Sequence, residues 1–118
     1  MSEPTSEQRA DALHYQFMED SKRRPVLLFF TGKGCVPCAN LKKELERRPV
    51  DPSKVTQFTL DAWTDPVANL VAARFNVMQV PTLIVVWEGK ECLRLRGFTP
   101  QTRNQLETGL GHVLRSVG

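Results

Sequence analysis

The sequence contains one pair of residues whose types and spacing could do chemistry. Cys35 and Cys38 flank Val36 and Pro37 in the stretch TGKGCVPCANLKKE, residues 31–44. Such a C-x-x-C pair suits dithiol–disulfide exchange, half of a metal site, or a structural disulfide. The structural alternative contributes little, because closing so short a loop stabilises a protein by only roughly 2 kcal/mol.

A metal site needs more ligands than this pair supplies. The nearest further candidates are Cys92, His14 and His112, and none of them forms a second C-x-x-C or a His-x3–5-His pattern. Both histidines fall on predicted helices, where they are interpreted as packed or surface residues. We therefore expect no metal. Zinc or an iron–sulfur cluster bridged between two chains remains the minor alternative.

The segments around the cysteine pair place it where a strand turns into a helix. Residues 26–30, VLLFF, predict a strand buried on both faces, and the glycine turn 32–34 follows it. Leu41 and Leu45 then mark one face of a helix that ends near Arg48. A disulfide between residues three apart fits best at a helix start, because inside a regular helix the Cβ atoms are about 5–6 Å apart.

Unpaired N–H groups at this helix N-terminus predict different roles for the two cysteines. They stabilise an anion, so we expect the pKa of the Cys35 thiol to fall from about 8.5 toward ~7, with modest help from Lys33. Cys35 is therefore predicted to be the nucleophile. Cys38 lies one turn further into the helix and is predicted to be the resolving thiol, which attacks the mixed disulfide formed by Cys35.

Apolar periodicity and turn residues divide the rest of the chain into further elements. They are a helix from a Thr5–Gln8 capping box to about Lys22, a strand over 54–60, a helix opened by Asp65 and Pro66, strands 82–87 and 91–96 in a hairpin, and a last helix with Thr99 as its cap and Pro100 at its first position. Strand–helix–strand units favour parallel pairing, and the hairpin adds an antiparallel edge. We expect a single α/β domain over residues 1–118, with a four-stranded mixed sheet, helices on both faces and an N-terminal helix extension.

Composition excludes several classes of protein and partner. The net charge is only +3, and the basic pairs lack interleaved aromatic residues, so no nucleic-acid partner is expected. The longest apolar runs, 26–30 and 83–87, are far shorter than the ~18 residues of a membrane-spanning helix. The first residues, MSEPTSEQRAD, are acidic and have no apolar core, unlike a secretory signal. An odd count of three cysteines also argues against a secreted disulfide framework, so a cytoplasmic location is expected. A periplasmic or other oxidising compartment is the alternative if an upstream signal was removed.

Two distant motifs together resemble the thioredoxin family. CVPC follows an apolar strand and precedes a helix, Val80-Pro81-Thr82 stands between a helix and the hairpin, and Gly97 follows the second hairpin strand. The resemblance covers roughly residues 7–116, and the T-G-K-G-C-V-x-C wording is similar to the thioredoxin-like domains of bacterial thiol–disulfide interchange reductases. It implies a thioredoxin-like fold in which Pro81 is a cis-proline opposite the cysteines. It also implies that Val80 and Pro81 form a platform for an extended substrate peptide and that Pro81 blocks metal capture.

The sequence departs from the pattern of thioredoxins proper at several positions. Gly34 stands where the family has a tryptophan, Phe29 where it has a buried aspartate, and Gln57 where it has the matching lysine. The first strand of a full thioredoxin also lacks a counterpart. Trp63, in the turn after the strand over 54–60, is expected to replace the missing aromatic beside Cys35, although plain turn packing is an equal alternative.

The leading hypothesis from these residues is a dithiol–disulfide oxidoreductase that reduces protein disulfides. The Cys35–Cys38 disulfide is its redox centre and no cofactor is expected. Gly34 and Trp63 join Val80 and Pro81 in binding substrate, and Lys33 and Pro37 support the cysteines. Expected partners are disulfide-containing proteins and an electron donor such as a thioredoxin reductase, with no membrane association and a monomeric chain. The alternative, motivated by the lost aspartate, lysine and tryptophan, is a binding, adaptor or redox-sensing module without turnover.

Overall fold

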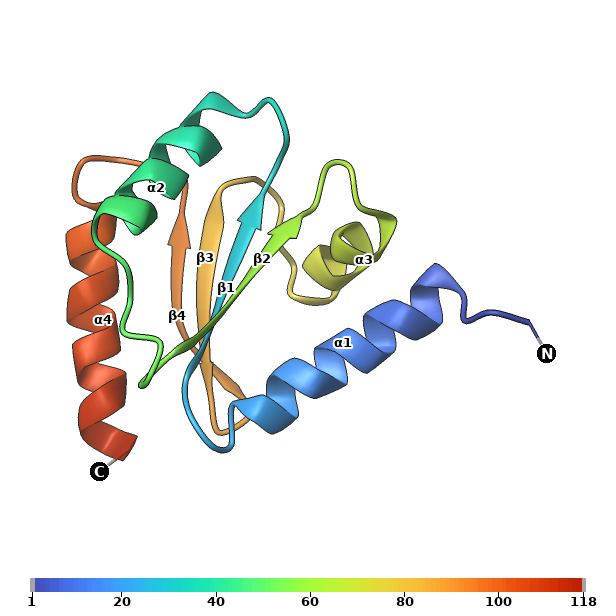
Figure 1. The fold of residues 1–118 in the computed structure, drawn as a ribbon, viewed down its shortest axis with the longest axis horizontal. Coiled ribbons are helices and arrows are strands. Elements are labelled where there is room, and N and C mark those ends of the chain that lie inside the picture. Colours follow the sequence, from blue (N-terminus) through green and yellow to red (C-terminus); the bar gives the residue numbers. More distant parts are fainter. Residues whose placement is uncertain (1, 118) are drawn as a thin grey trace.

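Four strands form one mixed sheet in the computed structural model, which describes residues 2–117 (Figure 1). The strands are β1 (Val26–Thr31), β2 (Thr56–Asp61), β3 (Thr82–Trp87) and β4 (Lys90–Arg96), in the spatial order β2-β1-β3-β4. β1 pairs in parallel with β2 and antiparallel with β3, and β3 pairs antiparallel with β4. The predicted four-stranded mixed sheet is therefore confirmed.

Helices cover both faces of the sheet, two on each side. They are α1 (Ser6–Asp20), α2 (Val36–Arg47), α3 (Pro66–Arg74) and α4 (Thr102–Val117). Buried side chains of α1 and α3 belong to one core cluster, and those of α2 and α4 belong to a second cluster on the opposite face (Figure 1). The sheet therefore separates two hydrophobic cores.

The central strand β1 explains the uninterrupted apolar run in the sequence. Val26, Leu28 and Phe30 point into the core under α1 and α3, whereas Leu27 and Phe29 point into the core under α2 and α4. Successive side chains of a strand alternate between its faces, so a strand covered on both sides needs apolar residues at every position.

Strand β2 lies at an edge of the sheet and is buried on one face only. Phe58 and Leu60 pack into the core of α1 and α3, whereas Gln57 and Thr59 are exposed on the α2 side. Within residues 2–117 no strand pairs with the outer edge of β2. The expected absence of a counterpart to the first thioredoxin strand therefore holds for the described residues.

Turns shift the starts of two predicted elements. The strand predicted from Lys54 begins at Thr56, because the amides of Lys54 and Val55 both donate to the carbonyl of Asp51 in a turn. The last helix begins at Thr102 rather than Pro100. Thr99 still acts as a cap, in the turn before the helix. The Thr99 hydroxyl accepts a hydrogen bond from the Gln101 N–H at 3.2 Å, and the Thr99 N–H donates to the Thr102 hydroxyl at 2.9 Å.

The β3–β4 hairpin contains a bulge at Cys92. Val85 pairs with Leu93 and Val86 pairs with Glu91, so Cys92 has no partner residue in the ladder. Its free thiol is exposed.

Arg103 joins α4 to the end of the helix that carries the cysteines. Its buried guanidinium donates from Nε to the carbonyl of Arg48 at 2.7 Å and from Nη2 to that of Pro49 at 3.5 Å. These carbonyls lie at the C-terminal end of α2, where carbonyl groups have no N–H partner within the helix. Burial lowers the pKa of Arg103 from its usual value. No pattern in the sequence indicated this contact between Arg103 and the end of α2.

The two glycines of α4 have different environments. A Cβ atom on Gly109 would lie 2.6 Å from Cδ2 of Leu93 on β4, whereas a Cβ on Gly111 would meet only Arg115 Nη1, at 3.7 Å. Gly109 therefore allows α4 to approach the sheet closely, and Gly111 has no such packing role.

Alanine at these two positions should separate helix propensity from packing. Gly111→Ala is expected to raise the free energy of unfolding by about 0.5–1 kcal/mol, because alanine loses less backbone entropy in a helix interior. Gly109→Ala gains the same propensity but displaces Leu93, so its stability should be lower than that of Gly111→Ala by about 1–3 kcal/mol. Urea denaturation of both variants measures the difference, and equal stabilities would contradict the close contact.

Candidate active site

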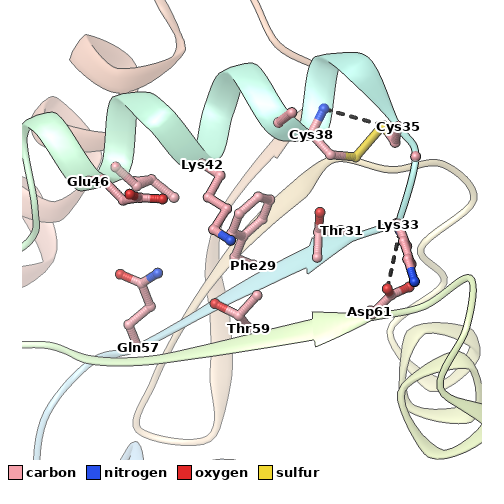
Figure 2. A pocket seen from close by; sticks show the side chains of 14 residues that line it. Phe29, Thr31, Lys33, Cys35, Cys38, Lys42, Glu46, Gln57, Thr59 and Asp61 are labelled. Carbon is pink, nitrogen blue, oxygen red and sulfur yellow. Dashed lines mark hydrogen bonds between the residues drawn. A yellow bond between two sulfur atoms is a disulfide. The ribbon is translucent and has the colours of Figure 1, made fainter.

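Cys35 and Cys38 form a disulfide at the N-terminus of α2, with their Cα atoms 5.2 Å apart (Figure 2). Cys35 is the N-cap residue of the helix and has extended backbone angles. The backbone N–H of Cys38 donates to Cys35 Sγ at 3.2 Å. A sulfur thus occupies the position where a serine or aspartate oxygen usually caps a helix.

The two sulfurs differ in their surroundings. Cys35 is 8% exposed and Cys38 only 1% exposed. When the pair is reduced, the Cys38 N–H and the helix N-terminus face Cys35 Sγ, where they favour a negative charge. The arrangement therefore suits attack by the outer sulfur first and by the inner sulfur second.

A loop far away in the sequence lies against Cys35. The peptide bond between Val80 and Pro81 is cis, and the carbonyl oxygen of Val80 is 3.9 Å from Cys35 Sγ. The Thr82 hydroxyl donates to the Gln79 carbonyl at 2.8 Å, and the Gly97 amide donates to the Pro81 carbonyl at 2.8 Å. The structure thus brings Val80 and Pro81 to the cysteines, and the residue after β4 holds this loop in place.

Gly34 precedes Cys35 in a left-handed conformation with φ of +88°. L-residues with a Cβ rarely adopt this conformation, whereas glycine does so without strain. A Cβ at this position would have no atom within 4 Å, so the backbone angle and not crowding favours glycine. This geometry accounts for the missing tryptophan before the first cysteine.

Trp63 packs against the turn that leads to Cys35. A Cβ atom on Gly32 would lie within 2.7 Å of Trp63 Cγ, so the indole covers the bare glycine backbone. The side chain is still 60% exposed. Trp63 also lines a groove of about 210 Å³ with Met78 and Val80, which connects it to the cis-proline loop. The contact of Trp63 in this turn is with Gly32, three residues before Cys35.

The two predicted supporting residues, Lys33 and Pro37, are both exposed. Pro37 lies in the first turn of α2, where its missing N–H costs no helical hydrogen bond. Lys33 is held by its backbone, because its N–H donates to a carboxylate oxygen of Asp61 at 3.2 Å (Figure 2).

The Asp61 carboxylate connects the loop after β1 to the loop after β2 through hydrogen bonds. Asp61 was not among the site residues predicted from the sequence. Its other carboxylate oxygen accepts from the amides of Trp63 and Thr64, each at 3.0 Å. Hydrogen bonding from the Thr64 side chain, joined by the amides of Thr64, Trp63 and Lys33, lowers the pKa of Asp61 against an opposing effect of desolvation. The signal was available, because Asp61 ends a strand parallel to β1 and pairs with Thr31, next to the glycine turn.

A cavity of about 550 Å³ lies beside the inner sulfur, between α2 and the exposed side of β2 (Figure 2). We call it the Cys38 cavity. Its lining includes Cys38, Phe29, Lys42, Glu46, Gln57 and Asp61. Phe29 and Gln57, the residues that stand in place of the family's aspartate and lysine, therefore line the same cavity as Cys38.

Two kinds of feature are absent from residues 2–117. No group of three or more His, Cys, Asp or Glu side chains is arranged to hold a metal ion. No helix in this part of the chain has the length and apolarity needed to cross a membrane.

Comparison with known proteins agrees with this geometry. Residues 16–110 match the family described as thioredoxin-like domain. The chain is 32% identical to thioredoxin from Alicyclobacillus acidocaldarius over 106 residues, which cover 89% of this chain and 94% of that protein. It is 30% identical to thioredoxin from Mycoplasma genitalium over 86 residues, or 70% of this chain and 78% of that protein.

Solved thioredoxin structures have the same fold. The structure of Fasciola hepatica thioredoxin matches with a TM-score of 0.69 at 22% identity, covering 83% of this chain and 91% of that one. Thioredoxin from Nicotiana alata matches with a TM-score of 0.68 at 20% identity, covering 92% of each chain.

The fold and the C-x-x-C disulfide define a thiol–disulfide oxidoreductase that acts on protein disulfides. The chain belongs to the thioredoxin family.

Asp61→Asn should lower the free energy of unfolding by an amount that depends on pH. A carboxylate whose pKa is lowered by folding stabilises the native state above its unfolded pKa of about 3.9, and this stability is lost as the pH falls through the folded pKa. The stability difference between the wild type and Asp61→Asn is therefore expected to be largest near neutral pH and to shrink in acid. Denaturation in urea across this range measures it.

Glu3→Gln provides a matched control, because the Glu3 carboxylate accepts no hydrogen bond and forms no ion pair within residues 2–117. The difference in stability between Glu3→Gln and the wild type should be small at every pH. A constant difference for Asp61→Asn would contradict the role assigned to the carboxylate.

Proposed function

We propose that the protein works as a reductase of protein disulfides, with Cys35 as the nucleophile and Cys38 as the resolving thiol. One observation carries this assignment: Cys35 Sγ accepts the N–H of Cys38 at a helix N-terminus while it lies 3.9 Å from the carbonyl of Val80. The first contact stabilises a thiolate, and the second places that sulfur beside backbone that a substrate can pair with.

The reaction consists of two exchanges that balance in electrons. The Cys35 thiolate attacks one sulfur of the substrate disulfide, and the other substrate sulfur leaves as a thiolate. The Cys38 thiolate then attacks Cys35 Sγ, which forms the Cys35–Cys38 bond and releases the second substrate thiolate. The substrate gains two electrons and the protein loses two. A dithiol electron donor, of the kind that thioredoxin reductases represent, restores the reduced pair.

The substrate surface surrounds the disulfide and is apolar. Val36 is 70% exposed, Trp63 60% and Met78 92%, an unusual grouping of large apolar side chains in water. We propose that an extended substrate segment lies along Val80 and Pro81, passes Gly34 where no side chain obstructs it, and contacts Trp63. Lys33 and Pro37 flank this path.

We further propose a cytoplasmic monomer that forms one domain over residues 1–118 and needs no cofactor beyond its disulfide. The exposed free thiol of Cys92 supports the compartment, because free surface thiols persist in reducing environments.

Insulin reduction by dithiothreitol tests the two cysteine roles. Cys35→Ser is expected to lower turnover to the uncatalysed rate, because it removes the attacking sulfur. Cys38→Ser should also stop turnover but should accumulate a mixed disulfide between Cys35 and insulin, visible on a non-reducing gel. Cys92→Ser serves as the control and should keep wild-type activity. Unchanged turnover in Cys35→Ser would refute the proposed function. Absence of catalysed turnover in the wild type, together with no mixed disulfide in Cys38→Ser, would favour a binding or adaptor module.

Trp63→Ala should reveal the substrate surface without damaging the redox centre. Loss of an exposed aromatic contact is expected to raise the KM for insulin about fivefold, while the reaction with a small disulfide reagent stays unchanged. Tyr15→Ala, which removes an equally exposed aromatic from α1, should leave both rates as they are. Equal effects of the two substitutions would contradict a substrate contact at Trp63.

A further inference from the structure

In the Cys38 cavity, the surroundings of the inner thiol differ from the thioredoxin pattern. Cys38 must lose a proton before it can attack the mixed disulfide. Phe29 and Gln57 supply no charge beside it. The ionisable side chains that line the cavity are Lys42 and Glu46 from α2, Lys33 from the loop after β1, and Asp61 from β2.

Lys42 lies on the same face of α2 as Cys38, one helical turn away. Residues four apart on a helix are neighbours, so Lys42 is about 6 Å from Cys38 along the helix axis. Its side chain extends from α2 toward the sheet, alongside the ring of Phe29 (Figure 2). Among residues 2–117 no carboxylate lies within ion-pair distance of its amine. Its charge is therefore not neutralised by a close partner.

The other three charges lie further along the helix or on other elements. Glu46 is two turns away, about 12 Å along the axis, and Coulomb interactions fall with distance. The Asp61 carboxylate is engaged by three backbone N–H groups. Lys33 precedes Cys35 and lies on the side of the outer sulfur. The nearest charge on the helix face of Cys38 is thus positive.

We propose that Lys42 is the electrostatic partner of Cys38, and that its ammonium group stabilises the Cys38 thiolate during the second exchange. The proposal rests on the two-cysteine mechanism given above. The Cys38 thiol gives its proton to a solvent or buffer base through the open cavity, and the thiolate attacks Cys35 Sγ. The bond between Cys35 and the substrate breaks, and the substrate sulfur leaves with the electron pair. Lys42 keeps its proton throughout.

The second exchange can be observed directly with 5,5′-dithiobis(2-nitrobenzoate). In a Cys92→Ser background, attack by Cys35 releases one coloured thiolate, and attack by Cys38 on the resulting mixed disulfide releases a second. Stopped-flow traces recorded from about pH 5 to 9 give a pH profile for each phase, and the profile of the second phase reports on Cys38.

Lys42→Gln is expected to raise the apparent pKa of the second phase by about half a unit, which slows that phase about threefold below the pKa. The first phase should not change. Lys42→Arg should restore the second phase, because it keeps the charge, and Lys42→Glu should shift it further than Lys42→Gln does. Lys43→Gln is the matched control, since Lys43 is exposed on the same helix but does not line the cavity.

Two results would overturn the proposal, and they have different meanings. If the wild type shows both phases and Lys42→Gln matches Lys43→Gln, Lys42 has no electrostatic role and the two-cysteine mechanism stands. If the wild type releases only one coloured thiolate, Cys38 does not resolve the mixed disulfide, and the mechanism fails together with the inference.

Discussion

The hydrogen bond from the Cys38 amide to Cys35 Sγ is the interaction on which the site depends. It makes the outer sulfur the cap of α2, so the same contact that starts the helix also stabilises a negative charge on the nucleophile. It also fixes where the disulfide can form. The Cβ atoms of residues three apart inside a helix are too distant for an S–S bond, whereas the extended backbone of an N-cap residue brings them together.

The sheet brings the second half of the site to this helix start. Phe30 near the end of β1 pairs with Thr82 at the beginning of antiparallel β3, so the residues after β1 and the residues before β3 meet at one edge. Cys35 follows the first segment and Pro81 ends the second. Asp61, at the end of β2, reaches the same edge because β2 is parallel to β1. The site is therefore a consequence of strand order, with each strand contributing the loop at that edge.

The sequence predicted the elements and motifs that depend on local pattern. The apolar run of β1 and the C-x-x-C at a helix start follow from spacing and residue type, whereas the cis peptide bond before Pro81 was implied only by the resemblance to the thioredoxin family. The contact of Asp61 with the Lys33 amide and the contacts of Arg103 could not be predicted in this way, because each joins a side chain to a backbone group at least 28 residues away. Propensity placed the start of α4 at Pro100, but hydrogen bonds between Thr99 and Thr102 formed a turn there instead.

The exposed edge of the sheet explains why the uncharged residues Phe29 and Gln57 are tolerated in the Cys38 cavity. A buried aspartate and lysine stabilise each other only while both are present and both are shielded, since a single buried charge is costly. Here the α2 side of β2 is open to solvent, and the Cys38 cavity reaches the surface along Gln57 and Thr59. A proton can leave an open cavity without a buried acceptor. The stabilisation of the thiolate proposed for Lys42 would cost little desolvation, because Lys42 is exposed to water.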